Sequence, residues 1–268
     1  MIVVVGEALV DLVVGTDGAV DAVLGGAPFN TARATARLGA HVEFVGGISH
    51  DRFGSLLAAR LTDDGVGIGH ATRTDRPTTL AAAEIGEDGS ATYRFYLEQT
   101  SAGTVEVGTI PVPSVDTGVG IFFTGGLGFV LEPLATAVVD AIGSLAGDVV
   151  VMIDVNCRPA VIEDRSAYVD RVVAVIGRAD IVKVSDEDLE YLFPGVGPLA
   201  AARRLLDVGA RAVVLTAGSS ATTVLAGDDR AEIAVPSIRG SVVDTIGAGD
   251  TFGAGMLAWW AASGWGRD

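Results

Sequence analysis

The sequence is poor in the side chains from which disulfide frameworks and many metal sites are built. Its 268 residues include one cysteine, Cys157, and three histidines. One cysteine cannot form a disulfide framework, so the composition favours a cytoplasmic protein and leaves few ligands for zinc. Lysine is equally scarce, because Lys183 is the only one in the chain. No glycine-rich loop precedes it, which excludes the P-loop nucleotide-binding proteins and their Gly-Lys-Ser/Thr sequence.

Positive charge and long apolar stretches are also in short supply. Lysine and arginine total 18 against 34 aspartates and glutamates, which gives a formal net charge of −16. Because nucleic-acid binding needs basic surface patches, we expect no nucleic-acid partner. Apolar stretches such as 118–131 are interrupted by glycine and fall short of the roughly 18 residues that span a membrane. We therefore expect no membrane partner.

The chain does contain enough apolar residues for a sizeable core, at 49% of the total. Short apolar runs alternate with amphipathic stretches, which is typical of an α/β fold with a mainly parallel sheet. The length fits one domain over 1–268. The expected buried strands are 2–5, 121–124, 149–155, 181–184 and 212–216, and the expected helices are 30–38, 53–61, 133–145, 165–178, 199–208 and 248–262.

Two segments depart from this alternation. Residues 9–24 and 78–98 have the pattern of alternating strands, and a Gly-Glu-Asp-Gly turn at 86–89 divides the second segment into a hairpin. We expect them to form a small β-sheet that stands off the main sheet. This sheet is either a lid over an active site or an additional hairpin, and the pattern alone does not distinguish the two.

The most informative segment is 244–252, which reads DTIGAGDTF and leads into an apolar helix. Glycines at a helix start allow backbone N–H groups to converge on an anion, which the helix dipole also favours. Asp250 falls in the first turn, where a carboxylate can accept a proton from an attacking hydroxyl while the N–H groups hold a phosphoryl group. The alternative is a tight turn in which Asp250 only complements the helix dipole.

A second segment, 25–32, reads GGAPFNTA and is followed by RLG at 37–39. The paired glycines Gly25 and Gly26 admit close approach of a ligand, and Asn30 can present both a donor and an acceptor to hydroxyl groups. Asparagine at a helix start also serves as an N-cap, which is the alternative role of Asn30.

Taken together and in this order, the two segments resemble the two signatures of the ribokinase-like (PfkB-type) carbohydrate kinases. The resemblance covers nearly the whole chain and is closest to fructokinase-like members, because 154–159 read DVNCRP and 183–188 read KVSDED. It implies a ribokinase-like three-layer sandwich with a mainly parallel sheet and a β-sheet lid at 9–24 and 78–98. It also implies ATP-dependent phosphorylation of a hydroxyl of a small sugar.

The resemblance further implies roles for individual residues. Asp250 would be the general base beside an anion hole formed by Gly247, Ala248 and Gly249. The substrate would be bound by Asp11, Gly25, Gly26, Asn30 and Arg158, the nucleotide by Lys183, Ser185, Thr216, Gly218 and Thr245, and the metal by Asp188. Ser185 and Asp188 depart from the family's N-x-x-E motif, in which Asn and Glu stand at these positions.

The implied cofactors are ATP and Mg²⁺, with K⁺ as an activator, and the lid could also pair two copies into a homodimer. Other activities of the same family stay open, namely a nucleoside kinase, a ribokinase and a 2-keto-3-deoxygluconate kinase. A non-catalytic sugar-binding protein is a further alternative. The intact Asp250 and its glycine loop argue against that last reading, because a binding module needs no base.

Overall fold

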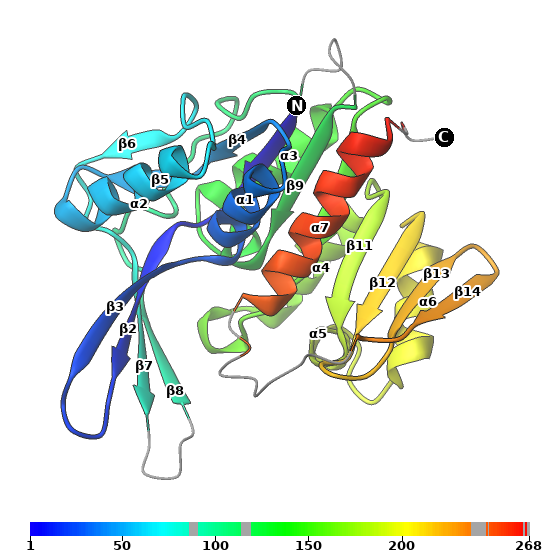
Figure 1. The fold of residues 1–268 in the computed structure, drawn as a ribbon. Coiled ribbons are helices and arrows are strands. Elements are labelled where there is room, and N and C mark those ends of the chain that lie inside the picture. The colour runs from blue at the N-terminus through cyan, green and yellow to red at the C-terminus, as the bar shows by residue number, and fades with distance from the viewer. Residues whose placement is uncertain (86–90, 114–118, 237–244, 246, 265, 267–268) are drawn as a thin grey trace.

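The computed structural model describes residues 1–85, 91–113, 119–236, 245, 247–264 and 266. Its main element is an eight-stranded sheet with the order β14-β13-β12-β11-β10-β9-β1-β4, which Figure 1 shows together with the helices that pack on it. The strands from β4 to β12 run parallel, and β13 and β14 are antiparallel additions at one edge. The strands are β1 (Ile2–Val5), β4 (Val42–Val45), β9 (Ile121–Gly125), β10 (Val150–Asp154), β11 (Ile181–Ser185), β12 (Ala212–Thr216), β13 (Thr222–Ala226) and β14 (Asp229–Ile233).

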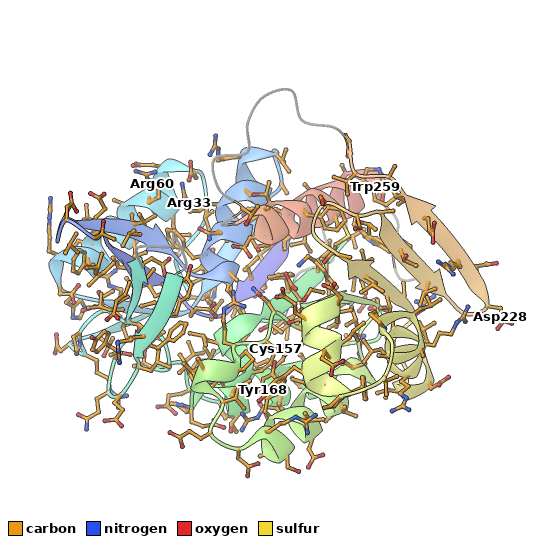
Figure 2. All side chains as sticks on the ribbon, turned by 90° about the horizontal axis from the view of Figure 1, so that it is seen from below. Arg33, Arg60, Cys157, Tyr168, Asp228 and Trp259 are labelled. Atoms are coloured by element: carbon orange, nitrogen blue, oxygen red, sulfur yellow. The ribbon has the colours of Figure 1, made fainter. Side chains whose placement is uncertain are left out.

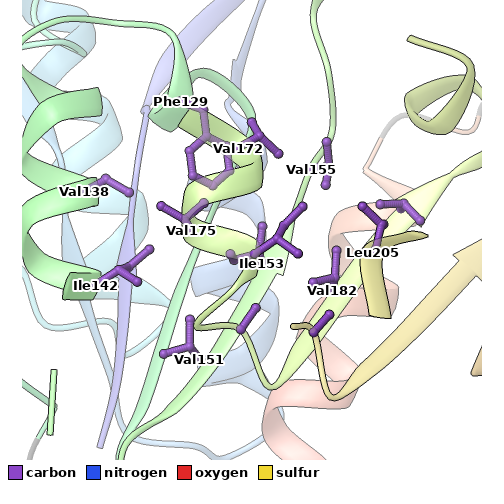
Figure 3. Close-up of a cluster of buried hydrophobic side chains, with 14 of the residues drawn as sticks. Phe129, Val138, Ile142, Val151, Ile153, Val155, Val172, Val175, Val182 and Leu205 are labelled. Carbon is purple, nitrogen blue, oxygen red and sulfur yellow. The ribbon is translucent and has the colours of Figure 1, made fainter. Parts of the chain in front are cut away.

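Helices cover both faces of this sheet because successive strand residues point to opposite sides. In β1, Ile2 and Val4 pack with the helices of one face, and Val3 and Val5 pack with those of the other. The first face carries α1 (Ala27–Arg37), α2 (Arg52–Asp63) and α7 (Ala248–Ser263), and the second carries α3 (Leu134–Ser144), α4 (Arg165–Ile176), α5 (Asp186–Leu192) and α6 (Pro198–Val208). Figure 3 shows part of the second core, where β10 side chains meet α3 and α4. The predicted three-layer α/β fold is confirmed.

A second, four-stranded sheet stands away from the main one, as Figure 1 shows. It contains β3 (Val20–Gly25), β2 (Leu9–Val14), β7 (Leu80–Ile85) and β8 (Ala91–Tyr96) in that order. This is the small sheet predicted from segments 9–24 and 78–98, and the turn predicted at 86–89 lies outside the described residues. Short strands β5 (Gly47–Ser49) and β6 (Thr72–Thr74) pair separately, and two short 3₁₀ helices, η1 (Gly126–Phe129) and η2 (Pro159–Val161), follow β9 and β10.

The structure corrects the predicted start of the first helix. The prediction placed that start at Asn30, but α1 begins at Ala27 with Gly26 as its N-cap. Asn30 therefore lies inside the first turn, so the alternative that it caps the helix was wrong. Elements too short for a clear periodicity were missed, including β4 and the antiparallel pair β13 and β14. Among the described residues, no helix is long and apolar enough to cross a membrane.

Candidate active site

A cavity of about 630 Å³ opens at the carboxyl edge of the main sheet. The chain passes from β1 to β4 on one side and later to β9 on the other, and open α/β sheets bind their ligands at such a switch point. The loops after β1, β9 and β10, the first turns of α1 and α7, and strands β2, β7 and β8 of the small sheet all line the cavity. The small sheet is therefore one wall of the candidate site.

The cavity brings together many of the residues that the sequence predicts for the site. Its lining includes Asp11, Gly26, Asn30, Arg158, Lys183, Thr245, Gly247, Gly249 and Asp250. Gly25, Ala248, Ser185, Asp188, Thr216 and Gly218 are described by the structure but are not part of this lining. Asp244 and Ile246 of the DTIGAGDTF segment lie outside the described residues.

Asp250 lies in the first turn of α7 and is 9% exposed. The helix begins after Gly247, whose φ of 74° is a left-handed conformation that favours glycine. The amide of Asn30 donates a hydrogen bond to Asp250 Oδ2 at 2.9 Å, which joins the first turns of α1 and α7. Burial raises the pKa of Asp250, and the Asn30 hydrogen bond, Lys183 and Arg158 oppose that rise. The carboxylate is therefore oriented and is more basic than an exposed one would be.

The first turn of α7 also supplies backbone N–H groups to the cavity. The N–H of Ala248 donates to the Thr245 carbonyl at 3.1 Å, and the first helical hydrogen bond runs from Thr251 to Gly247 at 2.9 Å. The N–H groups of Gly249 and Asp250 precede that bond, so they have no acceptor within the helix. Of the anion hole predicted at residues 247–249, the Ala248 N–H is thus engaged with Thr245, and we expect the N–H groups of Gly249 and Asp250 to be the ones that face an anion.

Lys183 is the cation nearest this turn. Its ammonium group donates to Asp154 Oδ2 at 2.7 Å, and both side chains are buried. A Cβ placed on Gly249 would lie 3.3 Å from Lys183 Nζ, so the ammonium group directly adjoins the glycine turn. Burial raises the pKa of Asp154 to about 6, and the ion pair with Lys183 opposes that rise. A buried charge needs such a partner, and here the partner also lies beside the first turn of α7.

The predicted glycine pair is explained in part by contacts within the protein. Gly25 in β3 leaves room for the Asp11 carboxylate, because a Cβ on Gly25 would overlap Asp11 Oδ2. Gly26 has a φ of 108°, and a Cβ there would lie 2.7 Å from the Glu7 carbonyl oxygen. Asp11 itself is half-buried, and burial raises its pKa while Arg158 opposes the rise. Gly26 and Asp11 face the cavity, whereas Gly25 lines a neighbouring hollow.

Arg158 approaches the cavity from the loop after β10. Its guanidinium Nη1 donates to the Asn156 side-chain oxygen at 2.6 Å and to the Cys157 carbonyl at 2.9 Å. Asn156 has a φ of 41°, a left-handed conformation that is uncommon for a residue other than glycine. This turn places Arg158 near the acidic side chains of the site, where its charge opposes the rise that burial causes in the pKa values of Asp11 and Asp250.

Asp188, the predicted metal ligand, accepts hydrogen bonds from backbone N–H groups with both of its carboxylate oxygens. Its Oδ2 accepts the Ser185 N–H at 2.8 Å, and Ser185 Oγ accepts the Asp188 N–H at 3.0 Å, which forms a capping box at the start of α5. Asp188 Oδ1 accepts the Cys157 N–H at 2.6 Å. Cys157 is buried beside Tyr168, as Figure 2 shows, and burial raises its pKa to about 12.

This arrangement does not fit a metal held by Asp188, because both carboxylate oxygens already accept backbone N–H groups. The part of the chain that the structure describes contains no cluster of three or more His, Cys, Asp or Glu side chains suited to a metal. These contacts give no support to the metal-binding role predicted for Asp188, and Ser185 acts here as a helix cap.

The residues predicted for the nucleotide are spread along the edge of the sheet. Thr216 ends β12, and its hydroxyl donates to the Val184 carbonyl at 3.3 Å. Gly218 follows in a turn with a φ of 55°. Thr245 alone of these three lines the cavity. Their roles toward ATP stay predictions.

Sequence reasoning missed three polar side chains that line the cavity, Glu7, Asn156 and Glu187. Each lies two residues after the end of a parallel strand, namely β1, β10 and β11. A polar residue shortly after a parallel strand is the signal that could have identified them, because the carboxyl ends of the strands meet at the ligand-binding edge. The aromatic wall made by Tyr93 and Phe95 of β8 was also not predicted.

The sequence profile of the pfkB family carbohydrate kinases matches residues 1–268. The chain belongs to the pfkB family. As a member it is an ATP-dependent sugar kinase, which agrees with the resemblance drawn from its motifs.

Relatives and solved structures support this assignment. A fructokinase of Rhizobium leguminosarum bv. trifolii is 35% identical over 263 residues, which cover 96% of this chain and 79% of that protein. Fructokinase-1 of Oryza sativa subsp. japonica is 32% identical and is covered to 82%, with 96% of this chain aligned. The ATP-bound fructokinase of Xylella fastidiosa superposes with a TM-score of 0.84 at 28% identity, over 97% of this pfkB kinase and 81% of that chain. An aminoimidazole riboside kinase of Salmonella enterica has a TM-score of 0.87 at 23% identity, over 98% and 86% of the two chains, and shows the shared fold.

Proposed function

We propose that this pfkB kinase phosphorylates a keto-hexose such as fructose, with Asp250 as the general base. The observation that carries the proposal is the placement of a buried, oriented carboxylate inside the cavity, beside the first turn of α7 and the only lysine of the chain. The choice of fructose is supported by the relatives at 35% and 32% identity, which are named fructokinases.

In the proposed mechanism, a sugar hydroxyl oxygen attacks the γ-phosphorus of ATP. A new O–P bond forms, the bond from the γ-phosphorus to the oxygen bridging it to the β-phosphate breaks, and ADP leaves. Asp250 takes the proton of the attacking hydroxyl, and its hydrogen bond from Asn30 keeps the carboxylate oriented. The N–H groups of Gly249 and Asp250, together with Lys183, offset the negative charge on the transferring group.

Sugar hydroxyls have several candidate partners on the lid side of the cavity. Asp11 in β2, Asn30 in α1 and Arg158 line the same cavity as Asp250. The carboxylates accept from hydroxyl groups, and the amide and guanidinium groups donate to hydroxyl oxygens. The small sheet carrying Asp11, Tyr93 and Phe95 forms the wall that would exclude water from the phosphoryl group.

The remaining cofactor and assembly predictions have less structural support. We propose that Mg²⁺ enters bound to ATP as part of the nucleotide substrate, because the carboxylate of Asp188 is occupied by backbone donors. Activation by K⁺, pairing of two copies through the small sheet and a cytoplasmic location stay predictions.

A coupled assay of ADP release tests the proposed function. The panel contains fructose, glucose, ribose, 2-keto-3-deoxygluconate and adenosine, each with ATP and Mg²⁺. The proposal expects the highest kcat/KM for fructose. A higher kcat/KM for adenosine than for every sugar would overturn it, and so would sugar binding without ADP release for any compound of the panel.

A further inference from the structure

Glu7 occupies a position in the cavity that none of the roles described so far explains. It follows β1 by two residues, at the switch point of the main sheet, between the start of α1 and the loop after β9. Its side chain lines the cavity although the residue is only 3% exposed. Glutamate is rarely this buried unless its polar atoms have hydrogen-bond partners, so we expect a partner for each oxygen of this carboxyl group.

The slot around Glu7 is built from glycines on two different elements. Gly26 approaches the Glu7 carbonyl group, and a Cβ on Gly126 would lie 2.9 Å from Glu7 Oε1. Both glycines have positive φ values, 108° and 58°, which favour glycine on conformational grounds as well. Gly126 thus lies beside the carboxyl group, and Gly26 lies beside the carbonyl group and Cγ of Glu7.

The two oxygens of this carboxyl group differ in their contacts. Oε1 accepts the N–H of Ala27 at 3.1 Å, at the first residue of α1. Oε2 is buried and has no hydrogen-bond partner among the described residues. A buried polar atom without a partner indicates a missing ligand or water, and here the residue lines the cavity that receives the substrate.

The charges around Glu7 determine its protonation. Asp250 from α7 and Arg158 from the loop after β10 act on it directly, and Asp11 from β2 and Lys183 from β11 line the same cavity. Burial raises the pKa of Glu7 to about 8, and the N–H of Glu7 itself, Arg158 and the Ala27 N–H only partly oppose that rise. At neutral pH the group therefore carries a proton, so it can donate from one oxygen while the other accepts.

We propose that Glu7 is a further substrate-binding residue, in which Oε1 stays on the Ala27 N–H and the Oε2 hydroxyl donates a hydrogen bond to a sugar oxygen. This inference rests on the proposed sugar site in the same cavity. The carboxylates of Asp11 and Asp250 accept hydrogen bonds from sugar hydroxyls, so the sugar oxygens need donors from other side chains. Glu7 supplies one such donor beside those of Asn30 and Arg158, and it does so without adding a third negative charge.

Direct titration with sugar, in the absence of nucleotide, tests this role in Glu7→Gln and Glu7→Leu. The titrant is D-fructose, or the sugar that the kinase panel selects. Glutamine retains an acceptor for Ala27 and a donor toward the sugar, so Glu7→Gln should bind sugar at pH 7 as the wild type does. Leucine has neither, and Glu7→Leu should bind roughly tenfold more weakly. Asp180→Asn is the matched control, because Asp180 is a buried acid that accepts the Val151 N–H at the opposite edge of the sheet.

The pH dependence separates substrate binding from support of the fold. Ionised Glu7 can still accept the Ala27 N–H but can no longer donate to the sugar. Wild-type affinity should therefore fall about tenfold between pH 7 and pH 9, as the group with a pKa of about 8 loses its proton, whereas Glu7→Gln should show no such fall.

Equal pH dependence in the wild type and Glu7→Gln would overturn the inference, and so would sugar binding by Glu7→Leu as tight as that of the wild type. Should Glu7→Leu fail to fold, the comparison of the wild type with Glu7→Gln decides alone. If the wild-type protein binds no sugar of the panel, the proposed function and this inference both fail. If it binds sugar but shows one of the two outcomes above, only this inference fails.

Discussion

The buried ion pair of Lys183 and Asp154 allows us to predict how much stability a substitution of Lys183 costs. In Lys183→Met the ammonium group that lowers the pKa of Asp154 is removed, so that pKa rises above its wild-type value of about 6. Near pH 7 the folded carboxyl group then binds a proton that the unfolded chain does not bind. Folding consequently becomes less favourable as the pH rises.

The size of this loss in unfolding free energy follows from the difference between the pH of the experiment and the wild-type pKa of Asp154. At pH 6 the wild-type carboxyl group is already half protonated, so the variant loses almost nothing through this group. At pH 7 the difference is at most one pKa unit, or about 1.4 kcal/mol of unfolding free energy. This is well below the ~3–5 kcal/mol expected if Asp154 remained buried as an unpaired charge, because the group takes up a proton instead.

Urea unfolding at pH 6 and pH 7 measures this difference. In the double variant Lys183→Met with Asp154→Asn, the titrating group is gone and the additional pH dependence should disappear. Activity is compared at pH 6, where the stability cost is small, and there kcat should fall about 10²–10³-fold through loss of a positive charge beside Gly249. The same stability difference from the wild type at both pH values would refute the reasoning about Asp154, and an unchanged kcat would refute the role of Lys183.

Three further predictions address the metal, the small sheet and the glycine turn. Turnover should stop in excess EDTA and return with Mg²⁺, because the β- and γ-phosphate charges need a divalent cation; full turnover in EDTA would contradict this. Amide hydrogen exchange across Leu80–Ile85 should slow when sugar binds, since this strand is part of the wall that is expected to close; unchanged exchange under saturating sugar would make the sheet a structural appendage. Gly26→Ala should lose more than about 1 kcal/mol of stability and also kcat/KM, because its Cβ would meet the Glu7 carbonyl group at a positive φ. Gly39→Ala is its control, with a φ of 92° and open space around the Cβ, and an equal loss of kcat/KM in both variants would refute the contact argument.

Much of the fold could be predicted because its signals are local. The five expected strands of the parallel sheet correspond to β1, β9, β10, β11 and β12, since strands buried on both faces have continuous apolar sequences. The antiparallel strands β13 and β14 lack such a sequence, and every residue of the edge strand β14 is exposed. The seven-residue helix α5 is too short to show a helical period.

The position of Asp250 in the cavity could be predicted, because a single segment of the sequence indicates it. Other residues of the site were less predictable, because their positions depend on contacts between distant segments. The glycines at 25 and 26 were interpreted as openings for a ligand, but they also accommodate Asp11 and the Glu7 carbonyl group. Asp188 was assigned to a metal by motif position, although its spacing from Ser185 is also that of a capping box. Glu7 has its role only through contacts with α1 and the loop after β9, which no local pattern contains.

The central claim is that Asp250 is the base of a sugar kinase, and the kcat of Asp250→Asn tests it most directly. Asparagine keeps the size of the side chain and an acceptor for Asn30, but it cannot take the hydroxyl proton. With saturating sugar and MgATP, kcat should fall about 10²–10⁴-fold, or roughly 3–5 kcal/mol of barrier. Sugar affinity and stability should change little, because a first-turn aspartate contributes only ~0.3–1 kcal/mol through the helix dipole. Asp186→Asn, at an exposed first-turn aspartate of α5, is the control for that dipole effect and should keep the wild-type kcat. An Asp250→Asn protein that retains more than about a tenth of the wild-type kcat would contradict the account, since loss of a general base costs more than that.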